Sequence, residues 1–364
     1  MPSQVTNYKC PACTGPMHYA GDSGRLECEY CGSNYSVEEI EKLYADKDAA
    51  AAAAPEQTAW DTSGLNENWG KDGEKLKTYS CPSCGAQLIC DDETAATSCP
   101  YCGNPTIVPG QFTGALKPDF VLPFRKTKEE AVAALRAHYL GKKLLPCVFT
   151  QENHIREIKG VYVPFWLFDA DVDTDLSFHA TRSNTMTTPN ERITQTEHFD
   201  VRRAGTVRFE HIPVDASKKM PDEYMDSVEP FDYADLKPFS TAYLPGYLAD
   251  VPDVTVEECS SRADRRAINT ALEETRSTVS GYDTLEETGR RINLRRGAVH
   301  YGLLPVWMLS TRWNGENYIF AVNGQTGKTV GDLPVSAKKY WTRWLAITAG
   351  VTVIGTLLVT LLGR

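Results

Sequence analysis

The chain has 364 residues, and this length suggests about two or three domains. Its 41% apolar residues suffice for a packed core, and its net charge of −10 argues against a protein that coats nucleic acid, because phosphates require basic surfaces. The N-terminal residues include no apolar segment, so no secretory signal peptide is visible.

The cysteines give the strongest pattern. Eight of the eleven form two sets with the spacing C-x2-C, fourteen residues, C-x2-C, and the second set begins 71 residues after the first. Two residues between thiolates let one tight turn present both sulfurs to a tetrahedral ion. Without an export signal, metal thiolates are favoured over disulfides. The spacing predicts two zinc ribbons and two Zn²⁺ ions, with iron as the alternative metal, at Cys10, Cys13, Cys28 and Cys31 and at Cys81, Cys84, Cys99 and Cys102.

A closed site of four cysteines leaves no open coordination position, so we expect it to bind or to stabilise rather than to catalyse. Such a small ribbon buries little core, so the metal must supply about 10 kcal/mol of folding free energy. Gly85 and Gly103 follow paired cysteines, where a turn with positive φ favours glycine. The other three cysteines, which have no partner pattern, are expected to be ordinary buried thiols: Cys90, Cys147 and Cys259.

The charge of the second ribbon bears on its partner. Four thiolates on Zn²⁺ carry a formal charge of about −2, and residues 81–103 add three acidic residues without any Lys or Arg. Neither ribbon can neutralise many phosphates, so a protein is the expected partner and nucleic acid is not. The three acidic residues are Asp91, Asp92 and Glu93.

Two further features follow the first ribbon. Ser36 and Glu39 form a capping box that predicts the start of a short helix. Residues 56–75 are polar and contain three glycines, which predicts a flexible linker. Trp60 and Trp69 within it either pack back onto a domain or mark a peptide-like contact.

The central region combines helix and strand signals. A capping box at Thr127 and Glu130 and a stop at Gly141 predict a helix over residues 127–141, and residues 257–279 predict a long charged helix. Alternating apolar residues predict strands at 171–180 and 206–214, the latter with Val207, Phe209 and His211 on one face. An Asn-Gly step predicts a hairpin over residues 308–324.

Two apolar segments share a Pro-x-Trp sequence, at residues 161–171 and 302–312. They predict either two related β-units within one α+β domain or two similar core strands without common origin. Residues 324–329 resemble a phosphate-binding loop, but Val322 stands where that motif needs glycine, so a β-turn is expected. No catalytic motif is visible and the seven histidines are scattered, which favours a protein without enzymatic activity.

Residues 289–297 form a basic segment in which Arg291 and Arg295 would share one face of a strand. This face would meet either anionic headgroups or an acidic partner, or would be a solvated strand edge.

The C-terminal segment, residues 345–362, has no charged residue and would span about 27 Å as a helix. Lys338, Lys339 and Arg343 precede it, a flank typical of the cytoplasmic side. We therefore expect a cell-membrane protein with a single-pass C-terminal anchor and cytoplasmic N-terminal domains, the alternative being a buried helix of a soluble fold.

The predicted fold class is α+β, with two four-cysteine zinc ribbons, a β-rich globular domain with helices, and one C-terminal transmembrane helix. The predicted parts are zinc ribbon 1 at residues 1–45, a flexible linker at 46–78, zinc ribbon 2 at 79–110, the β-rich domain at 111–335, and a juxtamembrane segment with the transmembrane helix at 336–364.

Together the cysteine spacing, the two Pro-x-Trp segments, residues 323–334 and the terminal apolar segment resemble bacterial TFIIB-type zinc-ribbon membrane proteins. Only the eight cysteines carry over residue by residue. The resemblance implies a membrane-linked protein that works beside SPFH (flotillin-like) or phage-shock partners. We therefore expect a non-enzymatic, membrane-anchored adaptor for protein partners, and the alternative is a membrane-tethered nucleic-acid-binding regulator.

Overall fold

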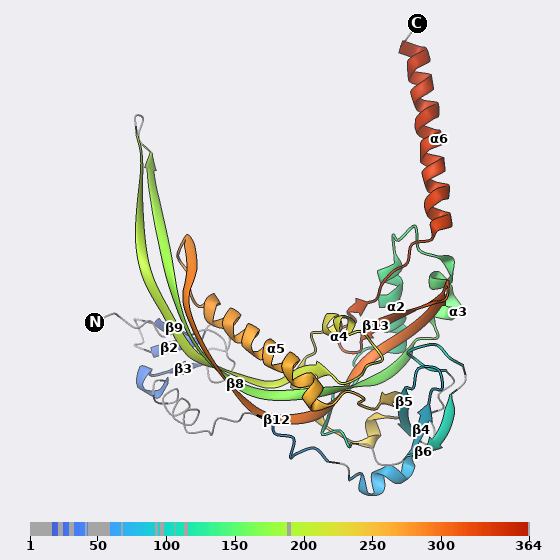
Figure 1. The fold of residues 1–364 in the computed structure, drawn as a ribbon, viewed down its shortest axis with the longest axis horizontal. Helices are drawn as coiled ribbons and strands as arrows, with labels where there is room; N and C mark the ends of the chain where they lie inside the picture. The colour runs from blue at the N-terminus through green and yellow to red at the C-terminus, as the bar shows by residue number, and fades with distance from the viewer. Residues whose placement is uncertain are drawn as a thin grey trace. The chain divides into compact units, whose positions relative to one another are not determined.

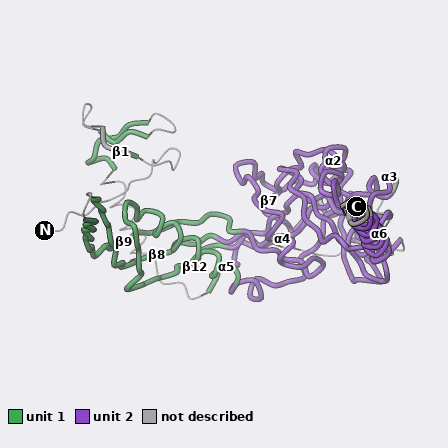
Figure 2. Tube along the Cα trace, turned by 90° about the horizontal axis from the view of Figure 1, so that it is seen from above, with its two compact units in different colours: residues 1–61, 169–212, 262–298 green, residues 62–168, 213–261, 299–364 purple. Residues whose placement is uncertain are grey.

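The chain divides into two compact units, which Figure 2 distinguishes by colour. Unit 1 comprises residues 1–61, 169–212 and 262–298, and unit 2 comprises residues 62–168, 213–261 and 299–364. The predicted domain boundaries stay a prediction. The computed structural model describes residues 17–20, 25–28, 33–40, 42, 59–66, 68–91, 94, 98–105, 107–112, 116–187 and 191–362 (Figure 1).

Unit 2 is built on a mixed sheet whose described strands follow the order β10-β7-β12-β8-β11-β5-β4-β6. Strand β11 pairs parallel to β8 and antiparallel to β5, and β7 pairs parallel to β12. The strands are β4 (Leu76–Ser80), β5 (Gln87–Asp91), β6 (Val108–Gln111), β7 (Phe120–Val121), β8 (Lys159–Thr187), β10 (Lys237–Pro238), β11 (Leu248–Asp250), β12 (Thr284–Trp313), β13 (Glu316–Asn323) and β14 (Thr329–Val330).

The predicted helix over residues 127–141 is confirmed as α2 (Lys128–Tyr139). The Thr127 side chain accepts a hydrogen bond from the Glu130 N–H at 3.3 Å, and the Glu130 carboxylate accepts one from the Thr127 N–H at 2.9 Å. The chain turns after the helix at Gly141, whose φ is 77°. The shorter helices of unit 2 are η1 (Gly70–Lys75), η2 (Cys147–Thr150), α3 (Glu152–Ile155), α4 (Asp222–Val228), η3 (Tyr233–Asp235) and η4 (Thr241–Tyr243).

Both Pro-x-Trp segments are buried, in β8 and β12, which are neighbours in the sheet. Each tryptophan donates its indole N–H to a backbone oxygen, Trp166 to Val254 at 2.9 Å and Trp307 to Lys126 at 3.0 Å. These bonds satisfy the polar atom of a ring that is otherwise packed in the core. The predicted relationship between two β-units stays a prediction.

The predicted hairpin is confirmed as β12 and β13, joined by Asn314 and Gly315 with φ of 53° and 85°. Residues 324–329 connect β13 to β14 as the expected turn. The Asn323 side-chain oxygen accepts hydrogen bonds from the N–H groups of Gln325 and Thr326 at 2.8 and 2.9 Å. A strand follows this loop instead of the helix that a phosphate-binding loop requires.

In unit 1 the outer parts of β8 and β12, together with β9 (Arg192–Asp215), belong to long curved strands (Figure 1). The predicted long helix is confirmed as α5 (Val256–Ser277). Ala263, Ala267 and Ala271 recur at every fourth position and are fully buried. The Thr275 hydroxyl contacts the Thr174 hydroxyl at 2.7 Å. Small residues on one face thus let this part of the helix pack closely on β8.

The strand predicted at residues 206–214 lies in β9, but its phase changes within the segment. Val207 and Phe209 are half-buried while Arg208 and Glu210 are exposed, as expected. His211 has φ of 60°, outside the strand region, and its N–H donates to the Asp169 carboxylate at 2.8 Å. This kink buries Ile212, which strict alternation places on the exposed face.

At the N-terminus β1 (Met17–Ala20), β2 (Arg25–Cys28) and β3 (Asn34–Tyr35) form a small antiparallel sheet. The capping box predicted at Ser36 is confirmed, because the Glu39 N–H donates to the Ser36 hydroxyl at 3.1 Å and the Ser36 N–H donates to the Glu39 carboxylate at 2.8 Å. In unit 2, Trp69 packs edge-on against Phe112 and Phe239. Of the two predicted alternatives for Trp69, this is the one in which the ring packs back onto a domain.

The prediction of a transmembrane helix at residues 345–362 is wrong. In the part of the chain that the structure describes, no helix, α6 (Ala337–Leu362) included, combines the length and apolar character that a bilayer crossing requires. Lys338, Lys339 and Arg343 charge its first turns. The single-pass anchor and the membrane location predicted from this segment are corrected with it.

Candidate metal centre

Two turns of the same shape carry the second cysteine set. The Cys81 N–H donates to the Ala86 oxygen at 2.9 Å, and the Gly85 N–H donates back to the Cys81 oxygen at 2.9 Å. The turn at Cys99 repeats both bonds, with Asn104 and Gly103, at 2.9 and 3.0 Å. Both glycines have positive φ, 73° and 69°, as the sequence predicts.

These turns bring four sulfur atoms together. The sulfurs of Cys81, Cys84, Cys99 and Cys102 all lie within 4.8 Å of one another. Cys81 and Cys102 are 3.6 Å apart, as are Cys84 and Cys99, too far for disulfides. A tetrahedral ion with Zn–S bonds of 2.3 Å requires sulfurs about 3.8 Å apart. The cluster therefore has the donor type and spacing that Zn²⁺ needs, and it can hold a metal ion.

The thiols differ in their surroundings. Burial raises the pKa of the Cys81 thiol, but hydrogen bonds from the backbone N–H groups of Cys84 and Ser83 outweigh it and lower the pKa to about 7. Burial raises the pKa of Cys84 to about 11 and raises that of Cys99 as well. A metal ion must therefore displace protons from at least two of these thiols when it binds.

The ribbon is part of the sheet of unit 2. Strand β5, which follows the first turn, pairs with β11 through Ile89 with Ala249 and Leu88 with Asp250. Cys81, Cys99 and the residue Tyr101 belong to the main apolar core, together with residues of β8 and β12. The metal centre thus lies against the core, where its folding is coupled to that of the sheet.

Tyr101, which lies between two cysteines of the cluster, forms a buried polar link. Its hydroxyl donates to the Asp250 carboxylate at 2.5 Å, and the Ser217 hydroxyl donates to the same oxygen at 2.8 Å. The Asn317 amide donates to the Tyr101 backbone oxygen at 2.7 Å. Burial raises the pKa of Asp250 to about 7. Sequence reasoning missed Asp250 and Ser217, since neither belongs to a local motif.

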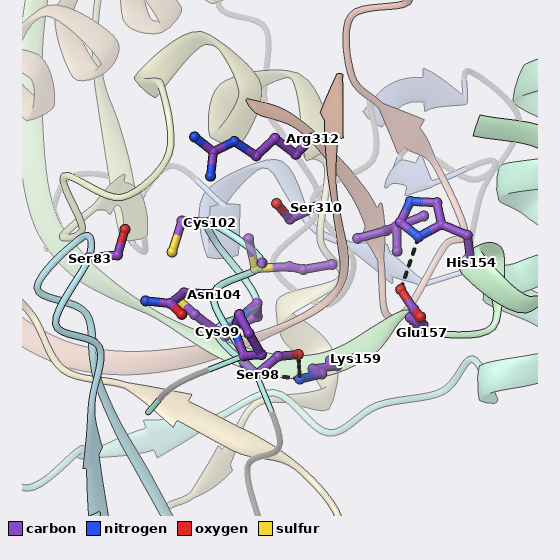
Figure 3. A pocket seen from close by; sticks show the side chains of 15 residues that line it. Ser83, Ser98, Cys99, Cys102, Asn104, His154, Glu157, Lys159, Ser310 and Arg312 are labelled. Carbon is purple, nitrogen blue, oxygen red and sulfur yellow. Dashed lines mark hydrogen bonds and ion pairs between the residues drawn. The ribbon is translucent and has the colours of Figure 1, made fainter. Parts of the chain in front are cut away.

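A pocket of about 480 Å³ adjoins the second turn (Figure 3). Its walls include Cys99 and Cys102, and its polar side chains come from the two cysteine turns, from the segment that runs from α3 into β8, and from the end of β12. From the sequence alone, no functional role was predicted for the residues that line the pocket opposite the cysteine turns. The polar residues lining it include Ser83, Ser98, His154, Glu157, Lys159, Ser310 and Arg312.

The first cysteine set is not brought together in the described residues. Cys10, Cys13 and Cys31 lie outside them, and Cys28 is buried in β2. The structure therefore supports one four-cysteine cluster, and the second predicted zinc ribbon is not shown. In the acidic segment, Asp92 and Glu93 also lie outside the described residues, whereas Asp91 accepts a hydrogen bond from the Thr94 N–H at 3.1 Å.

The three cysteines outside the two sets were predicted to be buried thiols. Cys90 and Cys259 are buried as predicted, but Cys147 is exposed in η2, so its prediction is wrong.

The basic segment at residues 289–297 forms ion pairs within the chain. Arg295 forms an ion pair with Asp173, and Arg296 pairs with Asp264 at 2.6 Å. This part of β12 is therefore neutralised within unit 1.

Comparison with known proteins adds one relative. The chain is 36% identical over 358 residues to the uncharacterized protein YdjG of Bacillus subtilis (strain 168), and the match covers 98% of each chain. The chain belongs to the family of YdjG. No family model matches it, and no solved structure does. The two chains are therefore similar over nearly their whole length. The resemblance to TFIIB-type zinc-ribbon proteins stays a prediction.

Proposed function

We propose that this chain is a non-enzymatic adaptor that binds a protein partner, and that Zn²⁺ at Cys81, Cys84, Cys99 and Cys102 stabilises the fold that does so. The observation that carries the proposal is the closed set of four sulfurs lying against the core. Four thiolates fill a tetrahedral ion, which leaves no position for a substrate or a water molecule. When bound, the ion supplies folding free energy and not Lewis-acid catalysis.

An exposed hairpin supports a protein partner. The described ends of β8 and β9, residues 182–187 and 191–198, are exposed throughout, and Met186 and Ile193 are among the exposed apolar side chains. Cross-strand hydroxyl pairs hold the strands in register, as at Thr185 and Thr194, 3.0 Å apart. Among the described strands, β9 pairs with β8 alone. An open edge of this kind is suited to a partner's strand.

The predicted second Zn²⁺ belongs to this proposal. The Cys28 N–H donates to the Ser33 oxygen at 2.9 Å, the same five-residue bond that Cys81 and Cys99 make in their turns. Zinc determination on the purified full chain tests this part of the proposal. We expect two Zn²⁺ ions per chain, and a result of one ion per chain would refute the second site.

The adaptor proposal is tested by partner capture. A tagged full chain expressed in its own organism should recover a specific partner after cross-linking, and Cys99→Ser with Cys102→Ser should lose both zinc and partner. The matched control is Cys147→Ser, because Cys147 is exposed and far from any cluster in sequence. SPFH-like or phage-shock proteins are the partners that the resemblance implies. An unchanged set of partners in the zinc-deficient variant would refute the proposal.

Nucleic acid is the competing class of partner. In the basic segment at residues 289–297, Arg295 and Arg296 already form ion pairs with aspartates of the same chain, so they are less available to phosphates than the sequence suggests. Binding of DNA or RNA that weakens steeply with salt would favour this class over a protein.

A further inference from the structure

The pocket beside the metal centre offers cations to a ligand. Arg312, on β12, is exposed, and within the described part of the chain its guanidinium makes no ion pair or hydrogen bond with another side chain. Figure 3 shows Arg312 on the side of Cys102 and Ser310, and Lys159 beside Ser98. The two cations therefore line one pocket from two neighbouring strands of the sheet.

Lys159 is held in place with a donor to spare. Its ammonium donates to the Ser98 backbone oxygen at 2.6 Å and to the Ser98 hydroxyl at 2.5 Å. An ammonium has three N–H donors, so one remains for a ligand. Because both bonds end on the residue before Cys99, the position of Lys159 is tied to the second cysteine turn.

The acidic residue of the pocket is already engaged. The Glu157 carboxylate contacts the His154 ring nitrogen at 2.9 Å, and the other ring nitrogen of His154 contacts the Thr311 hydroxyl at 2.7 Å. Figure 3 shows this pair at the far side of the pocket from Arg312. Among the Lys, Arg, Asp and Glu side chains that line the pocket, the charge without an ion-pair partner is thus positive.

The size and the donor types select a ligand. A pocket of about 480 Å³ lies at the lower end of the range for ligand sites and has room for an amino-acid side chain with its neighbours. Arginine offers two parallel N–H donors that match a carboxylate, and such charge-assisted bonds are about twice as strong as neutral ones.

We propose that this pocket binds a carboxylate of an acidic segment of the protein partner, with Arg312 as the fork that receives it and Lys159 as the second cation. The inference rests on the proposed adaptor function. It specifies a carboxylate as the partner group at this pocket, whereas the exposed hairpin indicates no particular chemical group. The competing explanation is that both cations only offset the formal charge of about −2 on a zinc tetrathiolate.

The test uses the zinc-loaded full chain and a fluorescent oligoglutamate peptide, followed by anisotropy. We expect Arg312→Gln to weaken binding about tenfold or more, and Arg312→Lys to weaken it less, since a lysine keeps the charge but loses the fork. The matched control Arg291→Gln removes an exposed arginine of unit 1 and should bind as the unmodified chain does. An oligoglutamine peptide should not bind.

Four outcomes would overturn the proposal. They are equal binding by Arg312→Gln, equal affinity for oligoglutamine, tighter binding of inorganic phosphate than of the peptide, and loss of zinc from Arg312→Gln. The last would show that the cation serves the metal centre. If Arg312→Gln still captures the cellular partner, the pocket assignment fails while the adaptor function stands. If the full chain captures no partner but binds oligoglutamate through Arg312, the adaptor function fails alone.

Discussion

At the scale of single residues, the contact between Tyr101 and Asp250 joins the metal centre to the core. Asp250 is 1% exposed, and its pKa rises from 3.8 to about 7 because burial disfavours the carboxylate. The folded chain therefore binds this proton more tightly than the unfolded chain does. The resulting stabilisation is present below pH 3.8 and is lost as the pH rises through about 7.

Asp250→Asn should remove this pH dependence, because an amide oxygen can still accept from Tyr101 and Ser217 and cannot titrate. We expect the variant to lose less unfolding free energy than the unmodified chain between pH 4 and 8, by up to about 4 kcal/mol. Urea unfolding at several pH values measures it. Glu129→Gln, an exposed site on α2, is the control, and parallel pH profiles for Asp250→Asn and the unmodified chain would contradict the expectation.

Tyr101→Phe should separate the core contact from the metal. The substitution leaves the buried Asp250 carboxylate with one donor fewer, which costs about 1–3 kcal/mol of unfolding free energy. Zinc content should stay unchanged, because no sulfur is touched, whereas Cys99→Ser should lose zinc. Metal determination combined with urea unfolding checks both parts, and zinc loss from Tyr101→Phe would show that the hydroxyl contact holds the turn in place.

At the scale of elements, local signals set where helices and turns begin, and packing sets how they are used. The cap at Thr127 and the Asn314-Gly315 turn are formed by neighbours in sequence, so both were predictable. The kink at His211 depends on Asp169, 42 residues earlier, so the burial of Ile212 was not.

Thr127→Ala should destabilise unit 2 by about 1 kcal/mol, because the Glu130 N–H loses its side-chain acceptor. The core under α2 includes Leu135, Phe149 and Phe320, so fraying of the helix reaches apolar packing. Thermal unfolding measures the change. Lys142→Ala, at an exposed position just beyond the helix, serves as comparison, and an equal effect at both sites would argue against a role for the cap.

At the scale of the whole molecule, the metal centre belongs to the main core of unit 2. Cys81, Cys99 and Tyr101 share one apolar cluster with Val161, on β8, and with Met308, on β12. A ribbon on an independent tether could lose a metal ion without consequence for the rest of the chain. Because this cluster is part of the core, we expect the loss of an ion from it to destabilise the sheet as well.

Metal removal should therefore destabilise more than the ribbon. Treatment with a strong chelator is expected to lower the Tm of the unit 2 transition by more than about 10 °C, because a structural Zn²⁺ supplies several kcal/mol of folding free energy. Calorimetry measures the shift, and re-addition of Zn²⁺ should reverse it. The variant with Cys99→Ser and Cys102→Ser should show no further shift with chelator. An unchanged Tm after complete metal removal would contradict coupling to the core.

The sequence by itself determined what depends on near neighbours: the spacing of the four clustered cysteines, the glycines that turn them, the helix cap and the hairpin turn. Each of these is a contact closed within a few residues, so the chain carries it in a short motif. Only the tertiary structure decided that Tyr101 meets Asp250, that Lys159 and Arg312 line one pocket, and that Arg295 is paired with Asp173. Those facts join residues up to about 150 positions apart, as at Tyr101 and Asp250, and long-range contacts of polar side chains leave no periodic trace in one sequence.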